Sequence, residues 1–261
     1  MSSSNKKIRL LTFNIFIRPP IVVERDKRDE RLLKIIEFIN NSDYDIICLQ
    51  ELFGYRSLFS SNNNGKNKLK LLNNVKGKYP YQNTSKTTTK TIPVDGGLVI
   101  LSKHKFEMFG EQSFPSKTLT GPDKFSRKGF IWCTILIDKT PILIINTHTQ
   151  AIYNEKQDYE YLKSQLDIIR EWLLMRLNEY DTLLLIGDLN TSNRKDFPKF
   201  IDANDVGYTW PTPLMKNQQK NKKLNLDYIL VIKGNKLSSS KVLYRIAGLS
   251  DHYPVEAEIK I

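Results

Sequence analysis

The clustering of apolar positions along the chain predicts eight buried strands. Short runs rich in β-branched and aliphatic residues recur through the sequence, and polar or turn residues end each of them. The runs lie at 8–16, 45–50, 96–102, 130–137, 141–147, 182–188, 227–232 and 255–261. Runs of this length, apolar at most positions, are typical of strands in a protein core.

Two longer segments have the spacing of amphipathic helices. Arg28–Asn41 places Leu32, Ile35, Ile36 and Ile39 on one stripe. Glu155–Tyr180 does the same with Tyr159, Leu162, Leu166, Ile169, Leu173 and Leu177. Both halves of the chain therefore begin strand, long helix, strand, which predicts two sheets packed face to face with helices outside. We expect a single domain over residues 1–261, with residues 1–7 as a disordered tail.

Composition supports a globular protein with an anionic partner. The chain has 261 residues, 40% hydrophobic and 10% aromatic, which excludes disorder as its main state. Forty Lys and Arg against 28 Asp and Glu leave a net charge of +12. This charge favours nucleic acid, an anionic membrane face or a phosphorylated substrate, without choosing among them. The basic stretches 52–94 and 206–250 are either solvated loops or docking faces for such a surface.

Cysteine usage and the absence of long apolar runs suggest a reducing compartment. Cys48 and Cys133 both lie inside apolar runs, so we expect buried thiols and no disulfide. No run approaches the ~20 apolar residues that span a membrane, and MSSSNKK does not have the pattern of a signal peptide. We expect a cytoplasmic monomer, peripheral at an anionic membrane when it meets one, with no protein partner.

Polar side chains with catalytic potential mark the ends of the predicted strands. They are Asn14, Glu51, His148, Asp188, Asn190, Asp227, Asp251 and His252. Taken singly, an Asn or Asp after a strand is usually a turn residue, His148 a structural histidine and Glu51 a surface charge. The set is more informative, because two of the three histidines stand at strand ends beside Asn or Asp. Loops at strand ends are where a rigid scaffold presents functional groups.

These residue types fit metal-assisted cleavage of a phosphodiester. Carboxylate and amide oxygens without thiolates suit Mg²⁺ or Mn²⁺ better than zinc, and the spacing of a zinc site is absent. A hard cation polarises phosphorus and stabilises the leaving oxygen, while two histidines share the proton transfers. The G-x-S-x-G elbow, the P-loop and the dinucleotide fingerprint are all missing.

The order of the motifs resembles a known superfamily. LTFN, LQE, NTH, GDLN, LDYI and SDHYPV, between Arg9 and Glu258, are similar to the endonuclease/exonuclease/phosphatase superfamily. The resemblance implies an α/β fold of the deoxyribonuclease I type, a four-layer α/β/β/α sandwich of two packed mixed sheets with outer helices. More narrowly, the chain resembles the bacterial neutral sphingomyelinases, which are magnesium-dependent enzymes of the phospholipase C type. The segments that carry this are YPYQ (79–82), DGGLVILSK (95–103), GPDKFSRKGF (121–130), THTQ (147–150) and TWPTP (209–213).

The resemblance assigns a role to each candidate residue. Glu51 is the expected principal ligand of the metal, with Asn14 alongside it and Asp251 close by. The expected metal is Mg²⁺, with Mn²⁺ or Co²⁺ able to substitute. His252, held in orientation by Asp227, is expected to activate the attacking water, and His148 is expected to bind the phosphate or the leaving oxygen. Asp188 and Asn190 are expected to position the water and a phosphate oxygen. Asp123 is expected to be an active-site carboxylate, and Asp95 to orient His148.

The implied activity is hydrolysis of sphingomyelin or a related phospholipid at a membrane surface. In-line attack by water gives ceramide or diglyceride and a phospho-headgroup. The alternative is an endonuclease of the DNase I or AP type, which the charge of +12 favours and in which Arg56 contacts a phosphate. A non-catalytic basic adaptor is the third hypothesis, and the filled catalytic positions weigh against it. The secreted family members carry a membrane-inserting aromatic hairpin between LDYI and SDHYP, and the interval here is short.

Overall fold

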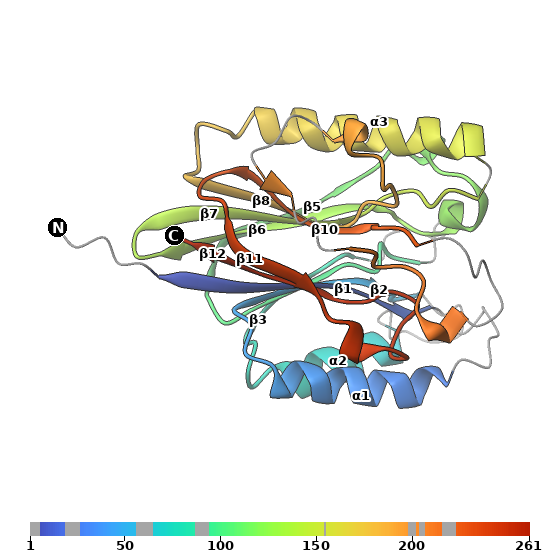
Figure 1. Ribbon diagram of the computed structural model, residues 1–261, viewed down its shortest axis with the longest axis horizontal. Helices are drawn as coiled ribbons and strands as arrows, with labels where there is room; N and C mark the ends of the chain where they lie inside the picture. The colour runs from blue at the N-terminus through green and yellow to red at the C-terminus, as the bar shows by residue number, and fades with distance from the viewer. Residues whose placement is uncertain are drawn as a thin grey trace.

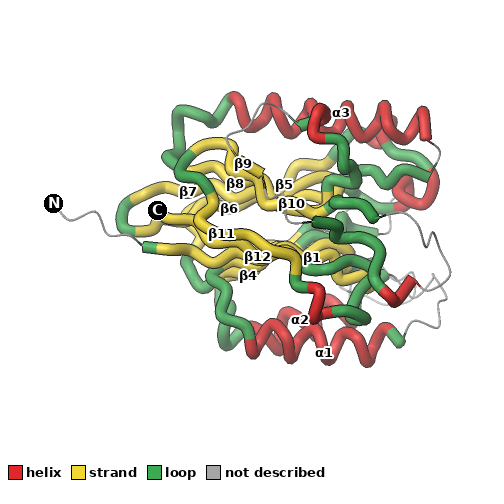
Figure 2. Tube along the Cα trace, in the orientation of Figure 1, coloured by secondary structure: helices red, strands yellow, loops and turns green. Residues whose placement is uncertain are grey.

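Two six-stranded sheets pack face to face in the computed structural model. It describes residues 6–18, 27–55, 65–86, 94–153, 155–197, 202–203, 207–215 and 223–261. The strand orders are β11-β12-β1-β2-β4-β3 and β5-β6-β7-β8-β10-β9. Helices α1 and α2 cover the outer face of the first sheet, and α3 covers that of the second (Figures 1 and 2). The predicted four-layer sandwich is therefore confirmed.

The first sheet is mixed. Its strands are β1 (Lys7–Ile17), β2 (Ile46–Leu52), β3 (Tyr81–Thr84), β4 (Val99–Ser102), β11 (Leu237–Val242) and β12 (Val255–Lys260). β1 runs parallel to β2 and antiparallel to β12. Lys7 already pairs with Lys260, so the expected tail cannot include Lys7, and residues 1–5 lie outside the described residues.

The second sheet has the same number of strands and one parallel pair. Its strands are β5 (Phe106–Ser113), β6 (Gly129–Ile137), β7 (Thr140–His148), β8 (Thr182–Asp188), β9 (Asp202–Ala203) and β10 (Asp227–Lys233). β7 runs parallel to β8, and β8 runs antiparallel to β10. Consequently the end of β7, the end of β8 and the beginning of β10 meet at one edge of this sheet.

In the described part of the chain, three α-helices flank the sheets. They are α1 (Arg28–Asn41), α2 (Lys66–Val75) and α3 (Glu155–Leu174). The bounds of α1 agree with the sequence prediction, whereas α3 ends at Leu174 and not at Tyr180, and residues 175–179 form turns. The short helices are η1 (Ser116–Thr118), η2 (Gly121–Phe125), η3 (Arg194–Asp196), η4 (Pro213–Met215) and η5 (Tyr244–Ile246). Among the described residues, no helix is long and apolar enough to cross a membrane.

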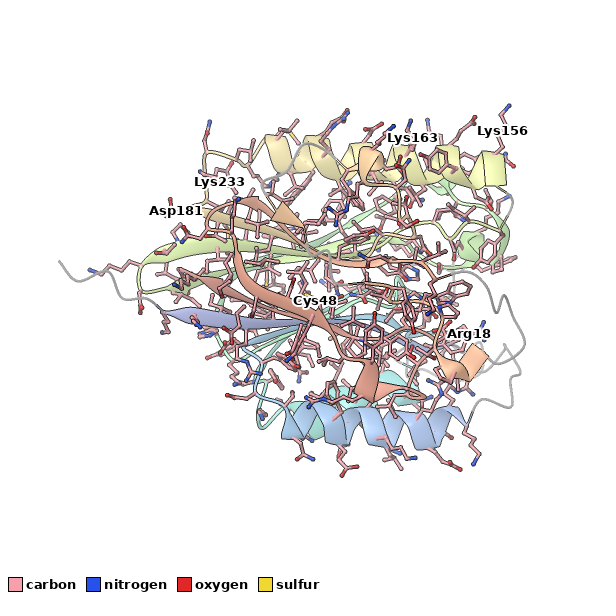
Figure 3. All side chains as sticks on the ribbon, viewed as in Figure 1. Arg18, Cys48, Lys156, Lys163, Asp181 and Lys233 are labelled. Atoms are coloured by element: carbon pink, nitrogen blue, oxygen red, sulfur yellow. The ribbon has the colours of Figure 1, made fainter. Side chains whose placement is uncertain are left out.

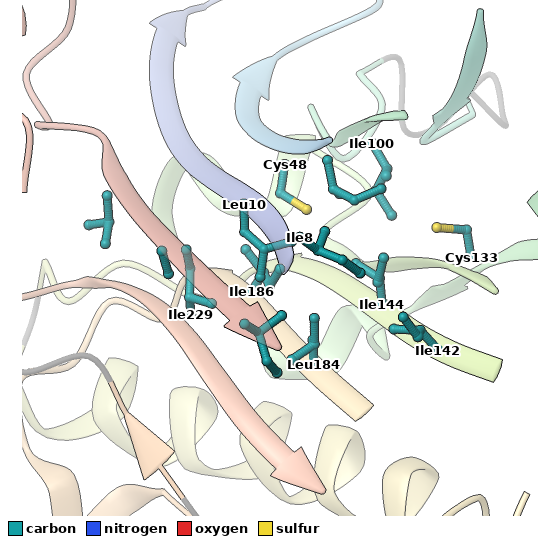
Figure 4. Packing of buried hydrophobic residues seen from close by; sticks show 14 of the residues in the cluster. Ile8, Leu10, Cys48, Ile100, Cys133, Ile142, Ile144, Leu184, Ile186 and Ile229 are labelled. Carbon is teal, nitrogen blue, oxygen red and sulfur yellow. The ribbon is translucent and has the colours of Figure 1, made fainter. Parts of the chain in front are cut away.

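Three apolar layers hold the sandwich together. Side chains alternate along a strand, so Leu10 of β1 points between the sheets while Leu11 points toward α1. Figure 4 shows the layer between the sheets, where Cys48 and Cys133 lie among isoleucines and leucines. Both thiols are buried and unbridged, as predicted. On the outer side of the second sheet, Leu162 of α3 belongs to a third cluster.

The directions of the strands place their functional ends together. At one end of the sandwich β1 begins and β12 finishes (Figure 1). β1, β2, β7 and β8 end at the other end, where β10 and β12 begin, and loops gather there in Figure 2. The polar strand-end residues predicted from sequence are therefore brought to a single end of the molecule.

Candidate active site

Strand register aligns three of the candidate residues. Asp188, the last residue of β8, lies opposite His148 of β7 on one side and opposite Asp227 of β10 on the other. His252 comes from the first sheet, in the segment that precedes β12. Packing of the two sheets therefore completes a group of two carboxylates and two imidazoles.

His252 lies among carboxylates. Its Nδ1 is 2.7 Å from Asp227 Oδ2, and its Nε2 is 3.7 Å from Asp188 Oδ2. Burial alone would lower the pKa of His252, but the negative charges of Asp227, Asp188 and Asp251 raise it well above its usual value. With Nδ1–H donated to Asp227, Nε2 is the nitrogen that can exchange a proton with a reacting group. This is the pairing predicted from the sequence.

His148 has the opposite surroundings. Its Nε2 lies 3.2 Å from the Nζ of Lys128 and 3.7 Å from Asp188 Oδ2. Its Nδ1 is buried and has no hydrogen-bond partner within the described part of the chain. Burial lowers the pKa of His148 well below its usual value, and the charge of Lys128 lowers it further. The imidazole is therefore neutral, with Nε2 as the functional edge.

Asp95 does not orient His148, so that prediction is wrong. Its Oδ2 is 2.6 Å from the Nζ of Lys68, and its Oδ1 accepts the backbone N–H groups of Gly54 (3.0 Å) and Gly97 (2.8 Å). Both oxygens are thus engaged, and the Nδ1 of His148 has no hydrogen-bond partner among the described residues. The Lys68–Asp95 ion pair is buried and ties helix α2 to the loop before β4, which is a structural role.

Asp123 contacts the site indirectly, through Lys128. The Nζ of Lys128 lies 3.0 Å from Asp123 Oδ2 and donates to the carbonyl of Thr149 at 2.7 Å. The same carboxylate oxygen accepts the backbone N–H of Ala151 at 3.1 Å. Asp123 therefore fixes the ammonium group that touches His148, and Lys128 connects this carboxylate to the imidazole.

Sequence reasoning did not identify Lys128 as a site residue. It stands between a basic stretch and the apolar run 130–137, where a lysine usually remains in solvent. Its side chain is instead buried, only 1% exposed. Its position directly before the buried strand β6 could have identified it, because a lysine at the start of a buried strand is buried only when it is paired.

Asn14 bridges two carboxylates. Its Nδ2 donates to Glu51 Oε1 at 3.0 Å and to Asp188 Oδ2 at 2.9 Å, and its Oδ1 accepts the backbone N–H of Phe16 at 3.2 Å. As placed, the amide nitrogen of Asn14 faces the centre and its oxygen is not available to a metal. A flip of the Asn14 amide would point its oxygen at the carboxylates of Glu51 and Asp188. That orientation is favourable only when a cation lies between the three oxygens.

Glu51 and Asp251 form a pair of interacting carboxylates. Burial and the charge of Asp251 raise the pKa of Glu51 to about 7, and burial also raises that of Asp251. The Oγ of Ser250 lies 2.6 Å from the carbonyl oxygen of Asn14 and 3.2 Å from Asp251 Oδ1. Glu51 adopts φ 56°, a left-handed conformation that is unusual outside glycine. Such a backbone at a strand end is typical of a side chain placed for function.

The excess of negative charge fits a divalent cation. Glu51, Asp188, Asp227 and Asp251 bring four carboxylates to the site. Ligand atoms of Asp188, Asp227 and His252 all lie within 4.8 Å of one another. Asp227 and His252 are already hydrogen-bonded to each other, which leaves Glu51 and Asp251 as the carboxylates that could hold a hard cation.

Asn190 connects the ends of β8 and β7. Its backbone N–H donates to Asp188 Oδ1 at 3.0 Å, and its Nδ2 donates to the carbonyl of Thr149 at 3.0 Å. Its φ of 49° is again left-handed. Burial and the nearby Asp227 raise the pKa of Asp188 to about 6, although this hydrogen bond opposes the shift. Asn190 thus holds Asp188 beside both histidines.

Comparison with known proteins identifies the family. The model of the Endonuclease/Exonuclease/phosphatase family matches residues 11–252. The chain belongs to this family. A relative named phospholipase C, from Staphylococcus aureus, is 27% identical over 97% of this chain and 87% of its own length. A sphingomyelinase C from Bacillus cereus is 23% identical over 100% of this chain and 91% of its own.

Solved structures of other proteins share the fold. SmcL superposes with a TM-score of 0.80 and 21% identity, covering 97% of this chain and 98% of SmcL. A beta toxin variant from Staphylococcus aureus with bound magnesium ions gives 0.74 and 23%, covering 97% and 99%. The DNase I-like sandwich predicted from the motifs is therefore the architecture of this family. Arg56, on which the nuclease alternative drew, lies outside the described residues.

Proposed function

We propose that the protein is a Mg²⁺-dependent phosphodiesterase of the sphingomyelinase type. It hydrolyses sphingomyelin, or a related phospholipid, to ceramide or diglyceride and a phospho-headgroup. The observation that carries the proposal is the hydrogen-bonded His252–Asp227 pair beside the carboxylates of Glu51 and Asp251. The support for a lipid substrate comes from relatives along the whole chain named phospholipase C and sphingomyelinase C.

His252 acts as the general base. Asp227 orients its ring, so that Nε2 faces the centre and takes a proton from the water that attacks phosphorus. Three carboxylates favour the protonated imidazole. When Asp251 serves as a ligand its charge is shared, so the pKa of His252 falls toward the range in which a base works. Bound at Glu51 and Asp251, Mg²⁺ would supply positive charge for the phosphate oxygens.

His148 and Lys128 bind the phosphate on the other side of Asp188. The ammonium of Lys128 contributes positive charge in a buried position, where hydrogen bonds to an anion are strong. The Nε2 of His148 lies 3.2 Å from that ammonium and 3.7 Å from Asp188 Oδ2, so both groups would face the same phosphate. Asn190 and Asp188 place the attacking water between this pair and His252.

The nuclease alternative is not favoured. The relatives above are named phospholipase C and sphingomyelinase C, and Asp123 stands where the sphingomyelinase resemblance requires an aspartate. In this chain Asp123 is buried and pairs with Lys128. Asp123 therefore holds the ammonium group of Lys128 at the phosphate position and does not add to a basic surface that could bind DNA. A net charge of +12 serves an anionic membrane as well as it serves DNA.

Headgroup release tests the proposal directly. Mixed micelles of sphingomyelin or phosphatidylcholine are incubated with the protein and Mg²⁺, with EDTA added, and with the His252→Ala variant as the blank. We expect release from sphingomyelin that requires both the cation and His252. Silence on both lipids together with cleavage of plasmid DNA would overturn the lipid assignment and restore the nuclease.

A further inference from the structure

Three large apolar side chains stand exposed beside the site. Phe125, at the end of η2, is 67% exposed, and Tyr153 and Ile152, shortly after β7, are 61% and 41% exposed. Phe125 lies close in sequence to Asp123 and Lys128, and Ile152 and Tyr153 lie close to His148. Exposed aromatic and aliphatic side chains that gather at the edge of a site mark an interaction surface.

The two segments that carry them are joined to each other. The backbone N–H of Ala151 donates to Asp123 Oδ2 at 3.1 Å, and that of Thr120 donates to Gln150 Oε1 at 3.0 Å. The ring of Tyr153 packs over Gly121, where an added Cβ would lie 3.4 Å from Cδ2 of the ring. Residues 121–125 and 151–153 therefore form one unit, here called the aromatic platform.

Helix α3 supports the platform from beneath. Asp158, 1% exposed, accepts the hydroxyl of Thr120 through Oδ1 and the backbone N–H of Tyr153 through Oδ2 at 2.7 Å. Both segments are therefore tied to the same buried carboxylate. A loop fixed in this way cannot turn its apolar side chains into the core, so Phe125 and Tyr153 stay in solvent until something covers them.

A second buried side chain of α3 repeats this arrangement. Gln165 donates through Nε2 to the carbonyl of Thr118 at 2.6 Å and accepts the backbone N–H of Gln150 at 2.8 Å. Gln165 is itself fully buried. The base of the platform is thus hydrogen-bonded at two points along α3, which positions it rigidly relative to His148.

The exposed charge of the segment that carries Phe125 is positive. Over residues 114–128 the only acid is Asp123, which is buried and paired with Lys128. The exposed charged side chains of that segment are Lys117 and Lys124. Lys156, also exposed, lies at the same end of the molecule as Arg18 in Figure 3. Lysines around exposed aromatic rings suit an anionic membrane surface, with rings at the interface and ammonium groups toward lipid phosphates.

We propose that the aromatic platform docks the protein on an anionic phospholipid surface. Phe125, Ile152 and Tyr153 enter the headgroup region, and the surrounding lysines attract anionic lipid. Because the platform is hydrogen-bonded to the loops that carry Lys128 and follow His148, docking brings lipid phosphates to the site. The role of docking in catalysis rests on the proposed function, but docking itself does not, because vesicle binding requires no turnover.

Vesicle sedimentation tests the platform separately from catalysis. The His252→Ala protein is mixed with vesicles of equimolar phosphatidylcholine and phosphatidylserine, which contain no sphingomyelin. The same protein carrying Phe125→Ser and Ile152→Ser is compared with one carrying Leu136→Ser. Leu136 is a matched control, because it is 51% exposed near the β6–β7 turn, at the opposite end of β7 from His148. We expect the platform variant to partition at least about tenfold more weakly, and the control to be unchanged.

Three results would overturn the inference. They are failure of the parent protein to bind these vesicles, binding by the platform variant within about twofold of the parent, and an equal loss in the Leu136→Ser control. Equal thermal unfolding midpoints of the three proteins show that the fold is intact. If headgroup release fails while vesicle binding depends on Phe125 and Ile152, the proposed function falls and the platform stands.

Discussion

His252 comes from the first sheet and lies among three carboxylates, whereas His148 comes from the second sheet and touches the ammonium of Lys128. The Nε2 atoms of both rings lie 3.7 Å from the same oxygen, Oδ2 of Asp188. The difference between the histidines therefore arises from their other neighbours. Two imidazoles whose surroundings shift their pKa in opposite directions are suited to different steps of one reaction.

Positive charge around a bound phosphate would depend on both sheets. The strand ends of the first sheet supply Glu51 and Asp251, and the loops of the second sheet supply Lys128. A cation held by the carboxylates and an ammonium beside His148 would then place positive charge on two sides of a phosphate. Neither sheet alone provides both, so the active arrangement depends on the packing between them.

The largest expected effect is loss of either imidazole. His252→Ala and His148→Ala should each lower kcat by roughly 10²–10⁴-fold, the usual scale for acid–base catalysis. Headgroup release under saturating Mg²⁺ measures this, with circular dichroism as the control for folding. Loss of the folded signal together with activity would contradict the catalytic assignment, since both residues lie at strand ends.

Removal of the carboxylate that orients His252 should have the next largest effect. Asp227→Asn keeps the shape but removes one negative charge, so the pKa of His252 falls and the favoured tautomer changes. We expect kcat to fall roughly 10²-fold. Asn193→Asp, at the exposed η3 turn, changes charge in the opposite direction and serves as a surface control. An Asp227→Asn variant with normal kcat would refute the pairing.

Weaker cation binding is expected when a metal ligand loses its charge. Glu51→Gln should raise the Mg²⁺ concentration needed for half-maximal activity about tenfold or more. The same variant should also lose much of the rise in unfolding temperature that saturating Mg²⁺ gives the parent, about 5 °C for a domain of this size. An unchanged Mg²⁺ response would place the cation elsewhere.

The smallest expected effect on catalysis is at Asp95. Asp95→Ala leaves the buried ammonium of Lys68 unpaired and should lower the free energy of unfolding by about 3–5 kcal/mol. The titration of His148 should not move, because Asp95 makes no contact with it. Denaturant unfolding and NMR of the imidazole measure the two quantities. A shift of the His148 pKa with unchanged stability would reinstate Asp95 as its partner.

The sequence predicted the interior strands and missed those with less burial. β8 and α1 have the predicted bounds, because nearly every inward position is apolar. β5 was missed because apolar side chains such as Met108 and Phe109 are exposed at the edge of the sheet. β11 has the sequence LSSSKV and also lies at an edge. β3, β9 and α2 lie in polar stretches, where the pattern of burial is too weak to identify them.

The residue types of the site were predictable, but their pairing was only partly so. Strand ends meet at one edge of a sheet, so Asp188, His148 and Asp227 could be grouped from order alone. The partner of His148 depends on loops whose course the sequence does not determine. Lys128 took the place proposed for Asp95, because the loop after η2 turns inward while Asp95 is bound by Lys68.

The most direct test of the account is titration of both imidazoles in one sample. NMR of the protein in EDTA, with the signals assigned from His252→Ala and His148→Ala, gives the two pKa values together. The account predicts that His252 titrates well above the usual value for histidine and His148 well below it. Lys128→Met should raise the value for His148 alone. Two ordinary and similar pKa values would contradict the division of labour between the histidines.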